Sequence, residues 1–168
     1  GLRPDVIDEE ADLDKYSIVF SPLMITLDQG DLRERISKWV ENGGIWITGP
    51  LTDIRTKDGT RFTDRLHGML ETLTPAVFKY WFPDKEKRVK AEWNDKETFG
   101  GNVYYEIFEP NDNADIVNVT EGHKEVIGGS VMQCFSVGKG FVYVLGTMPD
   151  EKDINKLITM VCEKAGIP

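Results

Sequence analysis

The side chains most able to do chemistry are two cysteines, two histidines and 29 acidic residues. Cys134, Cys162, His67 and His123 are scattered along the chain, so their spacing matches neither a zinc site nor a nucleophile–base pair. We expect both cysteines to be buried core residues and both histidines to be incidental. The sequence therefore predicts no catalytic, metal-binding or cofactor-binding residue.

Carboxylate pairs need a stronger signal, because so many acidic residues produce pairs by chance. Glycosidases use two carboxyl groups that flank a sugar. Asp53 follows an apolar strand in a polar loop that we expect to be flexible, and Glu121 precedes a turn. A hydrolase that uses Asp53 or Glu121 is thus a weak hypothesis. The run 111–115 lacks the glycine and the final acidic residue of a calcium loop.

The element best placed to position a site is a strand–helix–strand unit over residues 16–49. Ile18–Phe20 and Ile45–Ile47 are short apolar runs, as in strands covered on both faces. Between them we expect a helix that is capped by Asp28 and ends at Gly43-Gly44. Its apolar stripe consists of Leu32, Ile36, Trp39 and Val40. Such a unit predicts parallel strands, whose carboxyl ends are where sites usually lie.

The rest of the chain alternates between helical and strand periodicity. The expected elements are a strand over 2–7, a helix over 63–73 capped by Thr63, short strands within 76–99, strands over 103–108 and 115–119, a hairpin over 130–145 and a helix capped by Asp150 that ends at Gly166. This order predicts an α/β first half and a β-rich second half.

Bulk properties narrow the class of protein. At 168 residues the chain has the length of a single domain. Its net charge of −9 argues against nucleic acid and anionic membranes as partners. No stretch resembles a signal peptide or a membrane helix, which favours a cytoplasmic location without establishing one.

Aromatic residues gather in the segment 76–99, where the pattern of the chain is least regular. They are Phe78, Tyr80, Trp81, Phe82 and Trp93. Such a group can form a core, a protein interface or a platform for stacking a ligand such as a sugar. The sequence leaves these three roles open.

Several segments together resemble one known family. Ala11–Pro22 (ADLDKYSIVFSP), the helix and Gly-Gly stop within 32–49, the polar loop 53–59 and the hairpin 138–147 (GKGFVYVLGT) occur in the order found in the central domain of family 42 β-galactosidases. The resemblance spans most of the chain and is weakest over 74–129. Each motif is common, so their order and spacing carry the resemblance.

The resemblance implies a fold and an organisation. It implies a three-layer α/β/α domain with a mostly parallel, flavodoxin-like sheet, similar to class I glutamine amidotransferases, plus an added β-rich second half. Where those relatives place a catalytic Cys, this chain has Thr48-Gly49-Pro50. The family's catalytic glutamates lie on a preceding barrel domain, so no catalytic residue is implied here. We expect residues 1–168 to be one domain of a longer glycoside hydrolase, without its barrel and without the first strand and helix of the fold.

The function implied by the resemblance is assembly. We expect a non-catalytic trimerisation domain of a β-galactosidase-like glycoside hydrolase, without a cofactor, whose partners are its own copies in a homotrimer and the catalytic barrel of the same polypeptide. The five aromatic residues are the candidate interface. The alternative is a module that binds carbohydrate or another small molecule and uses the same residues for stacking.

Overall fold

The computed structural model describes residues 3–86, 88–102 and 104–167. In chain order its elements are the 3-10 helix η1 (Leu13–Lys15), β1 (Ile18–Ser21), α1 (Leu32–Glu41), β2 (Ile45–Thr48), α2 (Leu70–Leu73), β3 (Phe78–Pro83), β4 (Lys90–Trp93), β5 (Thr98–Phe99), β6 (Gly101–Asn102), β7 (Tyr104–Phe108), β8 (Asp115–Glu121), β9 (Ser130–Val137), β10 (Gly140–Leu145), β11 (Met148–Pro149) and α3 (Glu151–Lys164). None of the described helices is long and apolar enough to cross a membrane.

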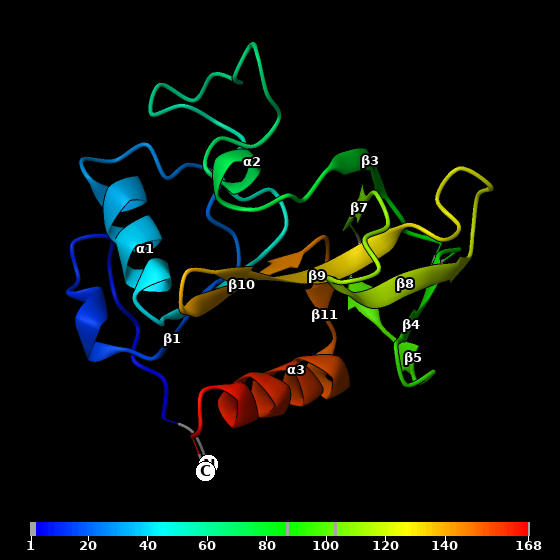
Figure 1. The fold of residues 1–168 in the computed structure, drawn as a ribbon. Coiled ribbons are helices and arrows are strands. Elements are labelled where there is room, and N and C mark those ends of the chain that lie inside the picture. The colour runs from blue at the N-terminus through cyan, green and yellow to red at the C-terminus, as the bar shows by residue number, and fades with distance from the viewer. Residues whose placement is uncertain (1–2, 87, 103, 168) are drawn as a thin grey trace.

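One curled, mixed sheet dominates the molecule (Figure 1). It has nine strands, and its main path runs β1-β2-β10-β9-β8-β4-β5, while β7 pairs with β9 and carries β3. Among the described strands, β2 pairs in parallel with β1 and β10, and the other pairs are antiparallel. Short β11 and β6 form a separate pair.

The prediction of a three-layer α/β/α fold with a mostly parallel, flavodoxin-like sheet is therefore wrong. Strand exceeds helix among the described residues, and a parallel sheet needs a long crossover for each strand. After β2, the connections within the second half are mainly turns and short loops, which favour antiparallel neighbours. The parallel character predicted from residues 16–49 is real but ends at β10.

Two hydrophobic cores lie on the two faces of the sheet. One core contains Trp39 and Val40 of α1 and Trp46 of β2. The other contains Leu157 and Val161 of α3, which lies below the sheet in Figure 1. We call these faces the α1 face and the α3 face.

Both long helices follow their sequence patterns. The four predicted stripe residues of α1 are buried, and Asp150 caps α3 by accepting a hydrogen bond from the backbone N–H of Asp153. The N-cap of α1 is Asp31 rather than Asp28. Asp28 instead accepts hydrogen bonds from Arg33 and from the backbone N–H of Lys57, so tertiary contacts override its capping preference.

Two other predicted elements are wrong. Residues 3–7 form no strand, and the helix expected over 63–73 is reduced to α2, which begins at Leu70. The reason lies in Asp53, whose backbone carbonyl accepts from Gly68 and whose carboxylate accepts from Met69. These bonds replace the helical ones that residues 63–69 would otherwise make.

Candidate functional site

A buried carboxylate, Asp53, lies beyond the carboxyl end of β2. Its Oδ1 accepts hydrogen bonds from the backbone N–H of Leu27 at 3.0 Å and from Arg33 Nη2 at 2.9 Å. Its Oδ2 accepts from the backbone N–H of Met69 at 2.7 Å and from Arg33 Nε at 3.2 Å. One side chain thus joins the loop after β1, helix α1 and the segment before α2.

This arrangement makes Asp53 structural. The side chain is completely buried, whereas the sequence predicted a flexible loop. Its φ of 53° lies in the left-handed region that a non-glycine residue adopts only under constraint. The hydrogen bonds to Asp53 raise the pKa of the Arg33 guanidinium. Both oxygens of the carboxylate already accept hydrogen bonds from other parts of the protein. The hypothesis of a hydrolase that uses Asp53 therefore gains no support.

A second buried carboxylate, Glu106 of β7, lies on the same face of the sheet as Phe108 in the α1-face core. Its Oε2 accepts from the backbone N–H of Leu51 at 2.9 Å, and its Oε1 lies 3.6 Å from His67 Nε2. The other ring nitrogen, His67 Nδ1, lies 2.8 Å from the carbonyl oxygen of Thr52. Glu106 and His67 are 2% and 3% exposed, so both polar groups are withdrawn from water.

Burial dominates the electrostatics of this second centre. It raises the pKa of Glu106, and the neighbouring His67 opposes this shift only in part. Burial together with the charge of Glu106 also raises the pKa of Tyr104 to about 12. Sequence reasoning missed the centre, because Glu106 looks like one polar residue of an alternating strand and His67 lies 39 positions away from it. The only available signal was a histidine beside an apolar stripe.

Arg61, Trp81 and Tyr104 form a cluster on the β3–β7 pair, which also carries Glu106, and we call it the Trp81 cluster. Trp81 is the cross-strand partner of Glu106, so both side chains lie on one face of the β3–β7 pair. The rings of Trp81 and Tyr104 are 5.9 Å apart, and the Arg61 guanidinium lies over the Trp81 ring at 5.3 Å. Trp81 nevertheless remains 48% exposed.

The structure separates the five aromatic residues that the sequence groups together. Trp93 is 3% exposed, and its indole N–H donates to Asp153 at 2.6 Å. Phe78 packs against the α1-face core and Phe82 against the α3-face core. Tyr80 is 39% exposed but pairs with Ile107, so it lies on the opposite face of β3 from Trp81. Trp81 and Tyr80 are thus the candidates with accessible rings.

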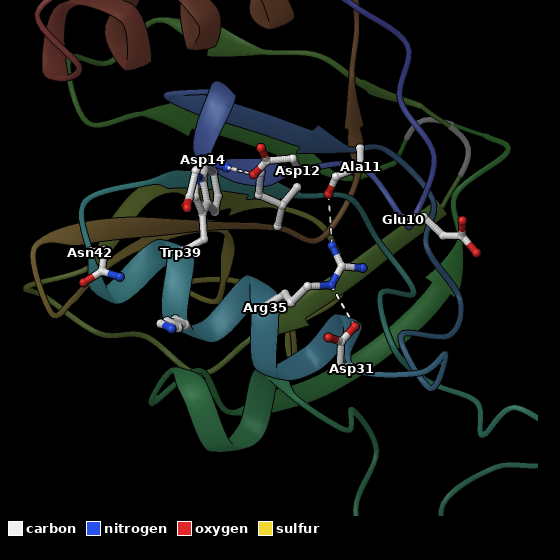
Figure 2. A pocket seen from close by; sticks show the side chains of 10 residues that line it. Glu10, Ala11, Asp12, Asp14, Asp31, Arg35, Trp39 and Asn42 are labelled. Atoms are coloured by element: carbon white, nitrogen blue, oxygen red, sulfur yellow. Dashed lines mark hydrogen bonds and ion pairs between the residues drawn. The ribbon is translucent and has the colours of Figure 1, made fainter.

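An open groove of about 480 Å³ runs between residues 10–14 and helix α1 (Figure 2). Figure 2 shows Arg35 reaching from α1 to the carbonyl oxygen of Ala11, at 3.0 Å, and to the carboxylate of Asp31, at 2.8 Å. Trp39 donates its indole N–H to the carbonyl oxygen of Tyr16. These hydrogen bonds hold the N-terminal segment against α1. The groove is therefore a structural contact between these two segments.

The remaining candidates do not assemble a site. Glu121 is exposed and pairs with Lys90. Cys134 is half-buried on β9, where burial raises its thiol pKa, and Cys162 is buried in α3. Within residues 3–86, 88–102 and 104–167, no three His, Cys, Asp or Glu side chains gather closely enough to hold a metal ion.

Comparison with known sequences identifies relatives along the whole chain. The family model for the β-galactosidase trimerisation domain matches residues 1–168. The chain is 30% identical over 175 residues to β-galactosidase YesZ of Bacillus licheniformis, covering 99% of this chain and 25% of that protein. It is 30% identical over 157 residues to YesZ of Bacillus subtilis, covering 91% and 22%. The chain thus spans about a quarter of the length of these relatives.

Solved structures agree in fold. A β-galactosidase from Bacillus circulans sp. alkalophilus superposes with a TM-score of 0.87 at 19% identity, over 97% of this chain and 25% of that one. A β-galactosidase from Halorubrum lacusprofundi gives a TM-score of 0.87 at 20% identity, over 97% and 24%. The mixed sheet described above is therefore shared with these enzymes. Together with the full-length match of the family model, these findings show that the chain belongs to the β-galactosidase trimerisation domain family.

Proposed function

We propose that this domain is the non-catalytic assembly module of a β-galactosidase-like glycoside hydrolase, and that three copies associate in a homotrimer. The family match and the relatives named β-galactosidase support the proposal. Since the chain covers about a quarter of those relatives, the catalytic barrel belongs to the remainder of the parent protein and is the second partner of this domain.

The observation that carries the proposal is the exposed Trp81 ring. The other three tryptophans, Trp39, Trp46 and Trp93, are each no more than 5% exposed. Trp, Tyr and Arg dominate the energetic centres of protein interfaces, and the Trp81 cluster contains one of each. Because Arg61 and Tyr104 hold the ring in place, docking would lose little side-chain entropy.

The other aromatic candidates take different parts in this proposal. Tyr80 offers a second contact on the opposite face of β3, and Val77 in the preceding loop is exposed as well. Phe78 and Phe82 contribute from within, because they anchor β3, which carries both exposed rings, to the two cores. Trp93 lies on β4 and is a core residue in this proposal.

The alternative function, carbohydrate stacking, has less support. A sugar stacks on an open aromatic face, but Arg61 lies over the Trp81 ring and Tyr104 packs beside it. A sugar would have to displace Arg61 before it could stack. The same contacts that reduce access for a small ligand favour a flat protein surface that can cover the whole cluster.

The test is the solution mass of the domain, measured by light scattering behind a sizing column over a range of concentrations. We expect the native domain to approach three times 19.0 kDa. Trp81→Ala should weaken assembly by at least about 30-fold in dissociation constant, as for a hot-spot residue worth about 2 kcal/mol. Ile127→Ala is the matched control, because Ile127 is equally exposed but lies outside the cluster.

Two outcomes would contradict the proposal. A native domain that stays monomeric at every concentration would show that this chain does not hold the trimer contact. A Trp81→Ala variant that assembles like Ile127→Ala would move the contact elsewhere on the surface. Titration with galactose, followed by tryptophan fluorescence, separates the alternative function, since stacking would perturb the exposed indole.

A further inference from the structure

The two ring nitrogens of His67 have different partners. Nδ1 lies 2.8 Å from the carbonyl oxygen of Thr52, and a carbonyl oxygen only accepts hydrogen bonds. Nδ1 must therefore be the donor of this hydrogen bond and carries a proton. Nε2 faces Glu106 Oε1 at 3.6 Å and has no hydrogen-bond partner in the described part of the chain.

This geometry requires one further proton between His67 and Glu106. Without it, the lone pair of Nε2 and a carboxylate oxygen would face each other at a buried position, two acceptors with no donor. With it, the pair is either an imidazolium with a carboxylate or a neutral imidazole with a carboxylic acid, and both arrangements supply a donor. The proton belongs to the pair rather than to either residue.

The pair connects the long loop after β2 to the sheet. Glu106 accepts from the backbone N–H of Leu51, a residue held at a φ of 60°, and His67 binds Thr52. Glu106 is also the cross-strand partner of Trp81. Glu106 therefore links the loop after β2 to the strand pair that carries the Trp81 cluster.

Other charged or titratable groups surround this point from several elements. They are Glu71 of α2, which accepts from the backbone N–H of His67, Asp53 with Arg33 of α1, Arg61 of the loop and Tyr104 of β7. Asp53 and Arg33 compensate each other. Arg61 favours the charged form of Glu106, but it is exposed to solvent and also lies over Trp81.

We propose that His67 and Glu106 form a one-proton clamp that holds the loop after β2 against β7, the strand that carries Tyr104 of the Trp81 cluster, so that trimer assembly weakens as the pH rises and the proton leaves. The link to assembly rests on the function proposed above. The clamp itself is a property of the folded domain and is tested separately.

The sign of the pH dependence follows from counting protons. In an unfolded chain an ordinary glutamate loses its proton near pH 4.3 and an ordinary histidine near pH 6.5. As the pH rises through about 6.5 and beyond, the unfolded state loses its second proton as well, whereas the folded pair retains one. Stability must then fall with rising pH, until the folded pair has also lost its proton. The pKa of Glu106, which burial raises, is consistent with this direction.

The first experiment measures the unfolding equilibrium by urea titration between pH 6.5 and pH 8.5. One retained proton increases the unfolding constant by up to about tenfold per pH unit. Glu106→Gln keeps the shape, lets its oxygen accept from Leu51 and lets its amide donate to His67 Nε2, so it should remove this contribution. His67→Gln should do the same by another route.

The controls are the exposed counterparts, Glu121→Gln and His123→Gln, which should keep the native pH dependence. A native profile that is as flat as that of Glu106→Gln would overturn the clamp. So would a steep profile that persists in both Glu106→Gln and His67→Gln.

The second experiment measures the solution mass at pH 6.5 and pH 8.5. We expect the native trimer to dissociate more readily at pH 8.5 and the Glu106→Gln trimer to respond less. A native trimer with the same dissociation constant at both pH values would overturn the link to assembly. A domain that is monomeric at both would contradict the proposed function, and the urea titrations would still decide whether the clamp exists.

Discussion

The domain buries two carboxylates, Asp53 in the loop after β2 and Glu106 within β7, and binds them differently. Asp53 receives two backbone N–H groups and both nitrogens of a guanidinium edge. Glu106 receives one backbone N–H and faces a histidine nitrogen at 3.6 Å. Their exposed fractions, 0% and 2%, are almost the same.

The difference shows that burial alone does not decide what a carboxylate does. Arginine keeps its charge at every pH at which the protein folds, so Asp53 has a permanent counter-charge. A histidine, unlike an arginine, can be neutral or charged in a folded protein, so Glu106 has no permanent counter-charge. We therefore expect the Asp53 centre to contribute a free energy of unfolding that does not change with pH, and the Glu106 centre to contribute one that does.

The largest expected effect comes from removing the carboxylate of Asp53, whose counter-charge is permanent. Asp53→Ala should lower the free energy of unfolding by about 3–5 kcal/mol, because it strands a partly buried Arg33 and two backbone donors. Urea unfolding at pH 7 measures the change. Asp58→Ala, an exposed position in the same loop, is the control and should change little. A loss below about 1 kcal/mol for Asp53→Ala would mean that the centre is not structural.

Only part of this centre could be predicted from the sequence. The periodicity of residues 32–40 gives the buried face of α1 correctly, because a helical stripe depends on local spacing. The shortened α2 could not be predicted. The first part of the helix predicted over 63–73 is replaced by hydrogen bonds from the backbone N–H groups of Gly68 and Met69 to Asp53, which is 15 or 16 positions away in the chain. Such competition between local propensity and tertiary contacts leaves no local pattern.

The Glu106 centre and the sheet were hidden for a related reason. Strand periodicity shows which residues alternate but not which strand each one pairs with, so it does not show that β1, β2 and the β-rich second half form one mixed sheet. The burial of each side chain within an aromatic segment cannot be predicted from the sequence either. Trp81 on β3 and Trp93 on β4 are only 12 positions apart in the chain, yet one is 48% exposed and the other 3%.

A milder change sharpens the comparison by keeping the charge and removing the geometry. Arg33→Lys leaves a cation near Asp53 but loses the paired Nε and Nη2 donors. We expect the free energy of unfolding to fall by about 1–2 kcal/mol, less than for Asp53→Ala. Arg65→Lys is the control, because Arg65 is exposed and forms an ion pair with its neighbour Asp64. Urea titrations of both variants at pH 7 measure the difference, and equal losses would show that the forked geometry contributes nothing.

The smallest expected effect comes from the second carboxylate that touches Arg33. Asp28 Oδ1 lies 3.3 Å from Arg33 Nη1, but its side chain is 37% exposed, so water screens the pair. Asp28→Ala should lower the free energy of unfolding by less than about 1 kcal/mol, including the loss of its bond from Lys57. A double-mutant cycle with Arg33→Ala isolates the coupling of Asp28 to Arg33, and the same cycle on Asp53 gives the buried reference. If the two coupling energies proved equal, the stability of the permanent centre would come from charge alone. A much larger coupling for Asp53 would show that it comes from burial and from the two parallel N–H···O bonds.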